Sequence, residues 1–400
     1  MKRWLAAIFA AFVLACTSSS SYARALRIGV LTDMNGMVSD ISGEGSVVAA
    51  RLAVEDFGPT VLSRPIEIIV GDHANKPDIG ASVARQWFDR DGVQMVIDLP
   101  NSSVALAVER VADDRKRIFI SSTGLAADIT GKACIPTGFQ WATDTYALAH
   151  GIANAVVKAG GKTWFFLTAD YAFGKNLAAD GADAVRQAGG TVVGQVLHPF
   201  DANEFATYLM SAKASGAQVI GLANGAGDTI NSIKQAHEFG IDTGGQQIAA
   251  FLLYITDVNS IGLEVGKGTY LVNSFYWDMD DNTRAFAKRF AVLHRGRMPT
   301  FAQAAVYSGV FHYLRAVKAA GTDDGPTVAA KMKELPVEDF YTHGARVRAD
   351  GRIVRDHYLF RIKSPAESKG PWDYYKLIAT IPGAEAVRPA AENPCPLLHR

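Results

Sequence analysis

Short apolar runs alternate with stretches of helical spacing through residues 26–120. Within residues 45–57, for example, Val47, Ala50 and Val54 recur at the spacing of one helix face. The predicted strands are residues 26–31, 66–70, 93–99 and 118–120, and the predicted helices are residues 45–57, 78–90 and 102–114. This strand–helix alternation is typical of a parallel sheet that is covered by helices on both faces.

A second series of the same kind follows it. The predicted strands are residues 163–167, 191–196, 218–222, 247–253 and 269–273, and the predicted helices are residues 174–188, 202–214, 226–239 and 257–264. Two successive doubly wound sheets explain this series better than one sheet of nine strands. A length of 400 residues also exceeds what a single hydrophobic core usually supports. We place the boundary between the two lobes near residues 141–146.

The pattern changes after Asn273. Helical stretches follow one another at 282–295, 301–320 and 326–335, and two further strands are predicted at 358–362 and 374–381. We expect the helices to return to the first sheet and the last strands to extend the second. The chain then crosses between the lobes several times.

The first residues have the features of a secretory signal peptide. Lys2 and Arg3 precede an apolar run over residues 4–15, and Ala23-Arg24-Ala25 offers a small-x-small cleavage site. The run is shorter than the roughly 20 residues of a spanning helix, although a buried N-terminal helix is the alternative. We therefore predict an exported, periplasmic protein with a signal peptide over residues 1–25, whose removal leaves a slightly acidic chain.

The three cysteines bear on anchoring and cross-linking. Cys16 follows Val13-Leu14-Ala15, which resembles a lipoprotein processing box, so a lipid anchor is an open alternative to free diffusion. Cys134 and Cys395 are expected to pair, because an oxidising compartment favours disulfides. The alternative is two separate thiols. Neither cysteine has the spacing of a zinc ligand.

Charge and motifs exclude several classes of function. The formal net charge is zero and no cluster of Lys and Arg stands out, which argues against a nucleic-acid partner. A complete G-x-G-x-x-G, a Walker loop, H-E-x-x-H and G-x-S-x-G are all absent from the sequence. We therefore expect no enzyme, no cofactor and no metal.

Polar and aromatic residues follow the predicted strands, where open parallel sheets bind ligands. The first series contributes a cluster of hydroxyl and amide side chains, and the second contributes aromatic walls with a few polar groups. The candidates are Asn101, Ser102, Ser121, Ser122, Thr123, Tyr171, Phe173, Asn224, Asp257 and Tyr276. Hydroxyls beside helix N-termini suit a carboxylate, and flat apolar walls suit a small organic molecule. The alternative for each polar candidate is an ordinary helix cap.

Several phrases resemble the branched-chain-amino-acid-type periplasmic binding proteins. They are Arg27-Ile28-Gly29-Val30 with Asn35-Gly36, Asn101-Ser102-Ser103, Ile120-Ser121-Ser122 and Ala169-Asp170-Tyr171-Ala172-Phe173-Gly174. The resemblance runs from about residue 26 to 380. It implies a type I binding fold, in which two α/β lobes joined by three crossings hold a solute for a membrane ABC permease. The lobes would be residues 26–143 with 276–352, and 144–275 with 353–382, followed by a tail over 383–400.

The resemblance also implies roles for single residues. Asn101, Ser102 and Thr123 match positions that hold the solute carboxylate, Tyr171 matches a second-lobe contact, and Asp257 is the nearest match to an acid that receives an ammonium group. Leu125 departs from the pattern, since leucine-binding relatives usually have a hydroxyl residue there. An aromatic or other hydrophobic carboxylate therefore competes with an amino acid as the solute.

We expect a monomer that binds a small carboxylate and a membrane permease. Two rival functions differ in what they require. A ligand-sensing receptor subunit needs a dedicated protein partner, and an exported hydrolase needs a nucleophile–base pair in the cleft.

Overall fold

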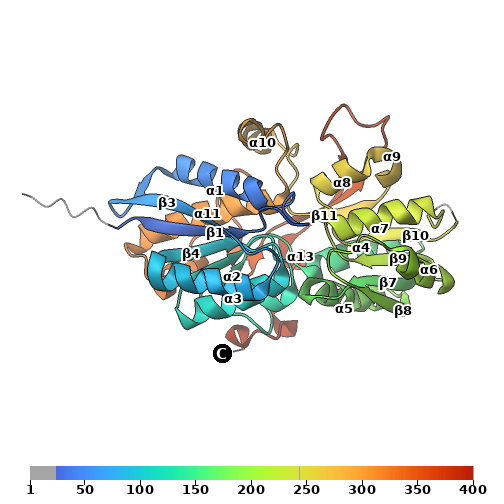
Figure 1. Ribbon diagram of the computed structural model, residues 1–400, viewed down its shortest axis with the longest axis horizontal. Helices are drawn as coiled ribbons and strands as arrows, with labels where there is room; N and C mark the ends of the chain where they lie inside the picture. The colour runs from blue at the N-terminus through green and yellow to red at the C-terminus, as the bar shows by residue number, and fades with distance from the viewer. Residues whose placement is uncertain (1–23, 243, 400) are drawn as a thin grey trace, which may run out of the picture.

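The computed structural model describes residues 24–242 and 244–399, which form two lobes that lie side by side (Figure 1). Each lobe is built from parallel strands and covering helices, so the prediction of an α/β fold with two lobes is confirmed. Residues 1–23, which include Cys16 and most of the predicted signal peptide, lie outside the described residues. Within the described residues, no helix combines the length and the apolar content that crossing a membrane requires.

A six-stranded sheet with the order β2-β3-β1-β4-β5-β6 forms the centre of the first lobe. Its strands are β1 (Leu26–Thr32), β2 (Thr60–Val61), β3 (Arg64–Asp72), β4 (Val93–Asp98), β5 (Ile118–Ser121) and β6 (Gly138–Gln140). All neighbours run parallel except the short β2, which pairs antiparallel with β3. The strand order reverses between β1 and β4, and such a switch point opens a crevice at the carboxyl ends of the strands.

Five helices cover this sheet: α1 (Gly43–Phe57), α2 (Pro77–Gln86), α3 (Ser102–Asp114), α11 (Phe301–Ala320) and α12 (Gly325–Glu334). Helix α10 (Asp281–Leu293) packs on α1. Helix α11 packs on α1 and β4 (Figure 1), so the chain returns to the first lobe. Its start is fixed by a capping box: the Thr300 hydroxyl accepts from the Gln303 amide at 3.2 Å, and the Gln303 side chain accepts from the Thr300 amide at 3.0 Å.

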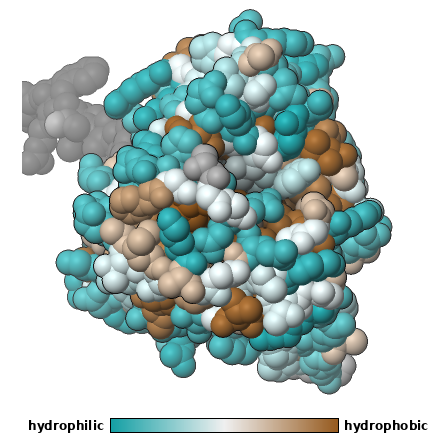
Figure 2. Space-filling model, turned by 90° about the vertical axis from the view of Figure 1, so that its right-hand side faces the viewer, coloured by the Kyte–Doolittle hydropathy of each residue, from teal (hydrophilic) through white to brown (hydrophobic). Residues whose placement is uncertain are grey.

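The second lobe repeats the plan with a parallel sheet of order β10-β9-β7-β8. Its elements are β7 (Thr163–Ala169), α5 (Ala172–Gln187), β8 (Thr191–His198), α6 (Ala206–Ala214), β9 (Val219–Ala223), α7 (Gly227–Glu238), β10 (Gln247–Ala250), α8 (Ile255–Ile261) and α9 (Leu263–Gly266). The order reverses between β7 and β9, which gives this lobe its own switch point. The end of this lobe exposes apolar side chains only in small separate patches (Figure 2).

The strand at 269–273 differs from expectation. The pattern predicts it as another strand of the second parallel series, but β11 (Tyr270–Asn273) pairs antiparallel with β14 (His357–Ile362), which pairs antiparallel with β15 (Tyr375–Ile381). The reason is topological, because β14 enters from the last crossing and runs against β11. A separate two-stranded ribbon joins β12 (Arg346–Val347) to β13 (Ile353–Val354).

Helix α4 (Thr145–Lys158) is absent from the sequence prediction. It packs against α5 and β11 and contacts β10 and β14, so it is enclosed on several sides. Nine of its fourteen residues are buried. After its first turn, the buried residues Leu148, Ile152 and Val156 recur at helical spacing, so the sequence carries the pattern of a helix here. The prediction placed the boundary between the lobes at residues 141–146 and assigned no helix after it.

Arg352 connects two of the crossings between the lobes. Its side chain is 1% exposed, and its Nε lies 3.1 Å from Oδ2 of Asp144. The guanidinium also donates to the carbonyl oxygen of Ala142 at 2.9 Å. Asp144 in turn caps α4, because its Oδ1 accepts from the amide of Ala147 at 2.9 Å. The first and third crossings are thereby tied to the first helix of the second lobe.

The C-terminal tail spans the hinge on the outside of the molecule. It begins with α13 (Gly383–Ala386), which packs on α4, and Arg388 then pairs with Asp180 of α5. Further along, Asn393 donates to the carbonyl oxygen of Thr130 at 3.1 Å. A disulfide joins Cys134 to Cys395, so the predicted pairing is confirmed. The tail therefore leads from the second lobe back to the first.

Arg352→Met is expected to lower the free energy of unfolding by about 3–5 kcal/mol, because it leaves the buried Asp144 carboxylate without its cation. Urea denaturation of the mature protein measures the change. Arg186→Met is the matched control: the Arg186–Asp183 pair is 61% and 64% exposed, and such pairs contribute about 0–1 kcal/mol. Equal losses in both variants would contradict this account of the hinge.

Candidate functional site

A narrow pocket with about 290 Å³ of empty space lies between the lobes. Its walls come from six chain segments that follow the carboxyl ends of β1, β4, β5, β7, β9 and β10. The lining residues are Val38, Ile41, Pro100, Ser102, Thr123, Leu125, Tyr171, Phe173, Gly225, Ala226, Leu252 and Tyr254. Both switch points therefore open onto one space, which is the position at which open α/β sheets bind ligands.

Four helices begin at this pocket. Ser102 is the first residue of α3, Tyr171 and Ala226 precede the first residues of α5 and α7, and Tyr254 precedes α8. The first turn of a helix carries partial positive charge from its unpaired amides. The pocket thus has an electropositive rim that is made by the backbone.

None of the described residues that line the pocket carries a charged side chain. Among its hydroxyl groups, Ser102 Oγ accepts from the amides of Leu125 and Ala126, both at 3.2 Å. Its own hydroxyl hydrogen has no acceptor in the described chain, so Ser102 can donate to a ligand. The second hydroxyl, on Thr123, is hydrogen-bonded to the carboxyl group of Asp98 behind the wall.

Aromatic rings form much of the remaining wall and connect the lobes. Tyr254 of the second lobe stacks on Phe301 of the first, with ring centroids 4.7 Å apart and an angle of 6° between the planes. Tyr171 packs edge-on against Phe200 at 4.9 Å. The amide of Ala172 also donates to Ser103 Oγ at 3.4 Å across the cleft. The lobes are closed on the pocket in this structure.

Four of the ten predicted site residues line this pocket: Ser102, Thr123, Tyr171 and Phe173. Three others support the wall from behind. Asn101 caps α3 by accepting from the Ser103 amide at 2.9 Å, Ser121 donates to the carbonyl oxygen of Gly124 at 2.8 Å, and Ser122 donates to Asp98 Oδ1 at 3.4 Å. Their polar groups are used within the protein.

The other three candidates also lie outside the lining. Asn224 is buried in a hydrogen-bond network with Thr229 and Ser232, which fixes the loop before α7. Asp257 is 2% exposed and accepts from the amide of Tyr254 at 2.9 Å. Tyr276 packs against Tyr375 and donates to the carbonyl oxygen of Trp372 at 3.2 Å.

Sequence reasoning missed most of the apolar lining. Pro100 and Leu252 lie two residues beyond the ends of β4 and β10, and Val38 and Ile41 lie six and nine residues beyond the end of β1, but the candidates chosen after the strands were mainly polar and aromatic. Their position after a strand end was the signal from which these apolar residues could have been identified as pocket lining. Asp98, the last residue of β4, was also missed because it was assigned to the strand.

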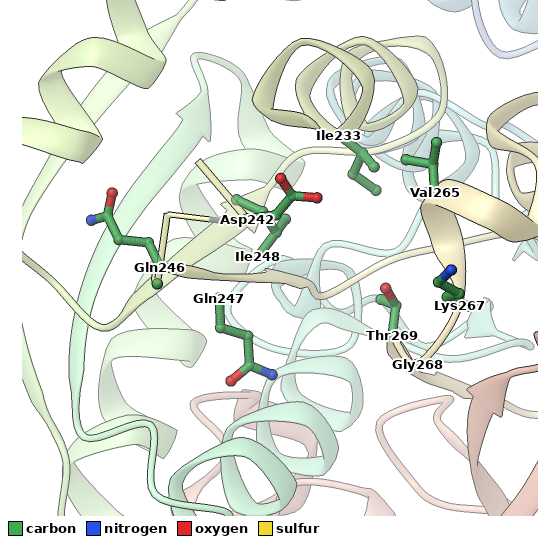
Figure 3. A pocket seen from close by; sticks show the side chains of 10 residues that line it. Ile233, Asp242, Gln246, Gln247, Ile248, Val265, Lys267, Gly268 and Thr269 are labelled. Atoms are coloured by element: carbon green, nitrogen blue, oxygen red, sulfur yellow. The ribbon is translucent and has the colours of Figure 1, made fainter. Parts of the chain in front are cut away.

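A wider hollow on the second lobe is lined by Ile233, Val265, Lys267 and the start of β10 (Figure 3). It opens beside Gln247 and Ile248, at the amino end of that strand. The interlobe pocket lies at the opposite, carboxyl end. In the described chain, no group of three or more His, Cys, Asp and Glu residues could hold a metal ion.

Residues 25–371 match the family model of the periplasmic binding proteins. A periplasmic binding protein from Burkholderia mallei has a similar structure, with 46% identity, a TM-score of 0.91 and coverage of 93% of this chain and 99% of that one. A branched chain amino acid ABC transporter periplasmic ligand-binding protein from Burkholderia xenovorans is 40% identical, with a TM-score of 0.83 and coverage of 93% and 100%. A solute binding protein from R. palustris in complex with benzoate shares the fold at 20% identity, with a TM-score of 0.81 and coverage of 93% and 100%.

Burial raises the pKa of Asp257 to about 7, against a hydrogen bond from the Tyr254 amide that lowers it. The folded protein therefore holds this proton more tightly than the unfolded chain does, and stability is lost as pH rises from about 4 through 7. We expect Asp257→Asn to reduce the fall in unfolding free energy over this range, where one carboxyl group contributes up to about 1.4 kcal/mol per pH unit. Asp281→Asn, at a 98% exposed side chain, is the control and should leave the slope unchanged. An unaltered slope in Asp257→Asn would refute the assignment.

Proposed function

We propose, since the chain belongs to the family of periplasmic binding proteins, that it is the solute-binding component of an ABC importer. It would act in the periplasm as a monomer and capture a hydrophobic or aromatic carboxylate that lacks an amino group. No bond is made or broken in this role. The solute is held between the lobes and released to a membrane permease.

The uncharged pocket at the meeting point of four helix N-termini carries this proposal. A carboxylate there gains from the partial positive charge of the helix ends and from the free hydroxyl hydrogen of Ser102. The rest of the solute meets Val38, Ile41, Leu252 and the ring of Phe173. Apolar walls with a few fixed polar groups are typical of small-molecule sites.

The same pocket disfavours an ammonium group. A buried cation needs a facing carboxylate, and none of the lining residues supplies one. Asp257, the acid expected for this role, is engaged by the Tyr254 amide, and burial favours its neutral form. Leu125 also replaces the hydroxyl that leucine-binding relatives usually have. These three features support an acid without an amine over an amino acid.

Binding would proceed by hinge closure. The first lobe offers Ser102 and Thr123 to the acid group, and the second lobe covers the apolar part with Tyr171, Phe173 and Tyr254. Closure excludes water, which strengthens the polar contacts inside. It also brings Tyr254 onto Phe301, so the closed surface differs from the open one. A permease can recognise that difference.

Calorimetric titration with matched pairs tests the class of solute. The pairs are phenylalanine with 3-phenylpropanoate and leucine with 4-methylpentanoate, together with benzoate, added to ligand-stripped mature protein. We expect binding of at least one simple acid and at least tenfold weaker binding of its amino acid, equivalent to about 1.4 kcal/mol. Tight binding of the amino acids alone would overturn the proposal and assign the protein to amino-acid uptake.

Substitutions at Tyr171 and Thr123 test the location of the site. Tyr171→Ala is expected to weaken binding of the preferred acid at least tenfold, because it removes an aromatic wall. Thr123→Ala should also weaken it, and neither change should unfold the protein. Tyr276→Phe is the matched control, because the Tyr276 hydroxyl donates to the carbonyl oxygen of Trp372 outside the pocket. The affinity of this variant for the acid should stay within about twofold of the wild type. Unchanged affinity in Tyr171→Ala and Thr123→Ala would refute this placement.

A further inference from the structure

Asp98 lies directly behind the pocket wall, as the last residue of β4. Its side chain is 0% exposed. One carboxyl oxygen, Oδ1, is hydrogen-bonded to the Thr123 hydroxyl, while Oδ2 is buried without a hydrogen-bond partner in the described chain. The backbone oxygen of Asp98 accepts from the amides of Ser122 and Thr123, both at 3.3 Å. Asp98 thus holds the loop that carries Thr123 by both its main chain and its side chain.

The surroundings of Asp98 contain hydroxyl groups and no cation. They come from Thr32 of β1, Ser46 of α1, and Ser122 and Thr123 after β5. The titratable side chain that faces it across the cleft is Tyr254, whose own pKa is raised partly by charge on Asp98. No Lys, Arg or His of the described chain forms an ion pair with Asp98. A carboxylate here would be buried without compensation, so burial raises its pKa and the hydroxyls only partly oppose the rise.

The backbone at this position is strained. Asp98 and Leu99 have φ values of +93° and +62°, and neither is a glycine. Such conformations cost on the order of 1–3 kcal/mol each and persist where the surrounding structure holds them. The strain turns the chain from β4 toward Pro100 and Ser102, which line the pocket.

The protonation of Asp98 decides what Thr123 can offer a ligand. A hydroxyl group has one hydrogen to donate. If Asp98 is ionised, Thr123 donates to it and presents only lone pairs to the pocket. If Asp98 holds its proton, it can donate to Thr123, and the hydrogen of Thr123 becomes free for an acceptor. A carboxylate solute has no hydrogen to donate, so it requires the second arrangement.

We propose that Asp98, in its protonated form, is a positioning residue that sets specificity: it donates to Thr123 Oγ1 and so directs the Thr123 hydroxyl toward the acid group of the solute. The inference rests on the proposed function and deepens it. The proton stays on Asp98 throughout. Ionisation of Asp98 reverses the direction of the hydrogen bond, so that Thr123 donates to Asp98. It also places a negative charge behind Thr123, and both effects weaken the capture of an anion.

Titration with benzoate and with 3-phenylpropanoate from pH 5.5 to 8.5 tests this role in three proteins. In the wild type, the dissociation constant should rise as Asp98 ionises, by up to about tenfold per pH unit, because the ionised form captures the anion more weakly. Asp98→Asn replaces the acid with an amide that can donate to Thr123 at every pH. It should bind the acids within about threefold of the wild type at low pH, show no such rise, and bind more tightly than the wild type at high pH.

Glu109→Gln is the matched control. Glu109 of α3 is 1% exposed and burial raises its pKa well above the usual range, but it does not line the pocket. This variant should keep the pH profile of the wild type. Asp257 and Asp228, whose pKa values burial raises to about 7, remain in all three proteins. A rise that persists in Asp98→Asn would therefore belong to those acids and overturn the inference.

Thermal unfolding checks that Asp98→Asn is folded. Loss of acid binding in the folded variant would also overturn the inference, because Asp98 would then be needed as an anion. The proposed function would survive that result, since the wild type still binds the acids. Failure of the wild type to bind either acid at any pH would contradict the proposed function and the inference together. Both are supported if Asp98→Asn retains acid binding with a flat pH profile while the dissociation constant of the wild type rises with pH.

Discussion

The interlobe pocket depends on a constraint at the hinge. Two separate parallel sheets form one pocket only if the carboxyl ends of their strands face each other. Arg352, on the third crossing, contributes to that alignment because it forms an ion pair with Asp144 on the first crossing. The pair is buried, so each charge needs the other. Because Asp144 also caps α4, the ion pair orients the first helix of the second lobe as well. In the proposed hinge closure, these two crossings would therefore stay together.

The electrostatics of the cleft follow from this arrangement. Helices begin where strands end, so facing sheets bring several helix N-termini to one space and make it electropositive without a lysine or an arginine. Acidic side chains nearby are buried, and desolvation favours their neutral forms at Asp98 and Asp257. In the proposed function, the charge in the site is then supplied by the solute. The proposed selectivity would then depend on whether the hydroxyl groups of Ser102 and Thr123 donate into the pocket or toward the protein.

The sequence allowed the fold to be predicted wherever local spacing carries the signal. Helix α11 agrees with the predicted range 301–320, and its ends are marked by the cap Thr300 before it and by Gly321 after it. Helix α4 was missed although its apolar residues recur at helical spacing, because the prediction used residues 141–146 as the boundary between the lobes. At the site, Ser102 and Thr123 could be found from strand ends. The supporting roles of Asn101 and Asn224 could not, because a cap and a ligand contact use the same side chains. Tyr276 was misleading for a similar reason, since an aromatic residue suits a core and a pocket equally.

The disulfide between Cys134 and Cys395 has a consequence for the order of folding. Its two ends are 261 residues apart in sequence, and almost the whole of the second lobe lies between them. The first lobe begins to form early, yet its cross-link cannot close until residue 395 has been synthesised. The lobe whose strands come first in the chain is therefore the last to be cross-linked, and Cys134 has to wait for its partner until the second lobe has been made.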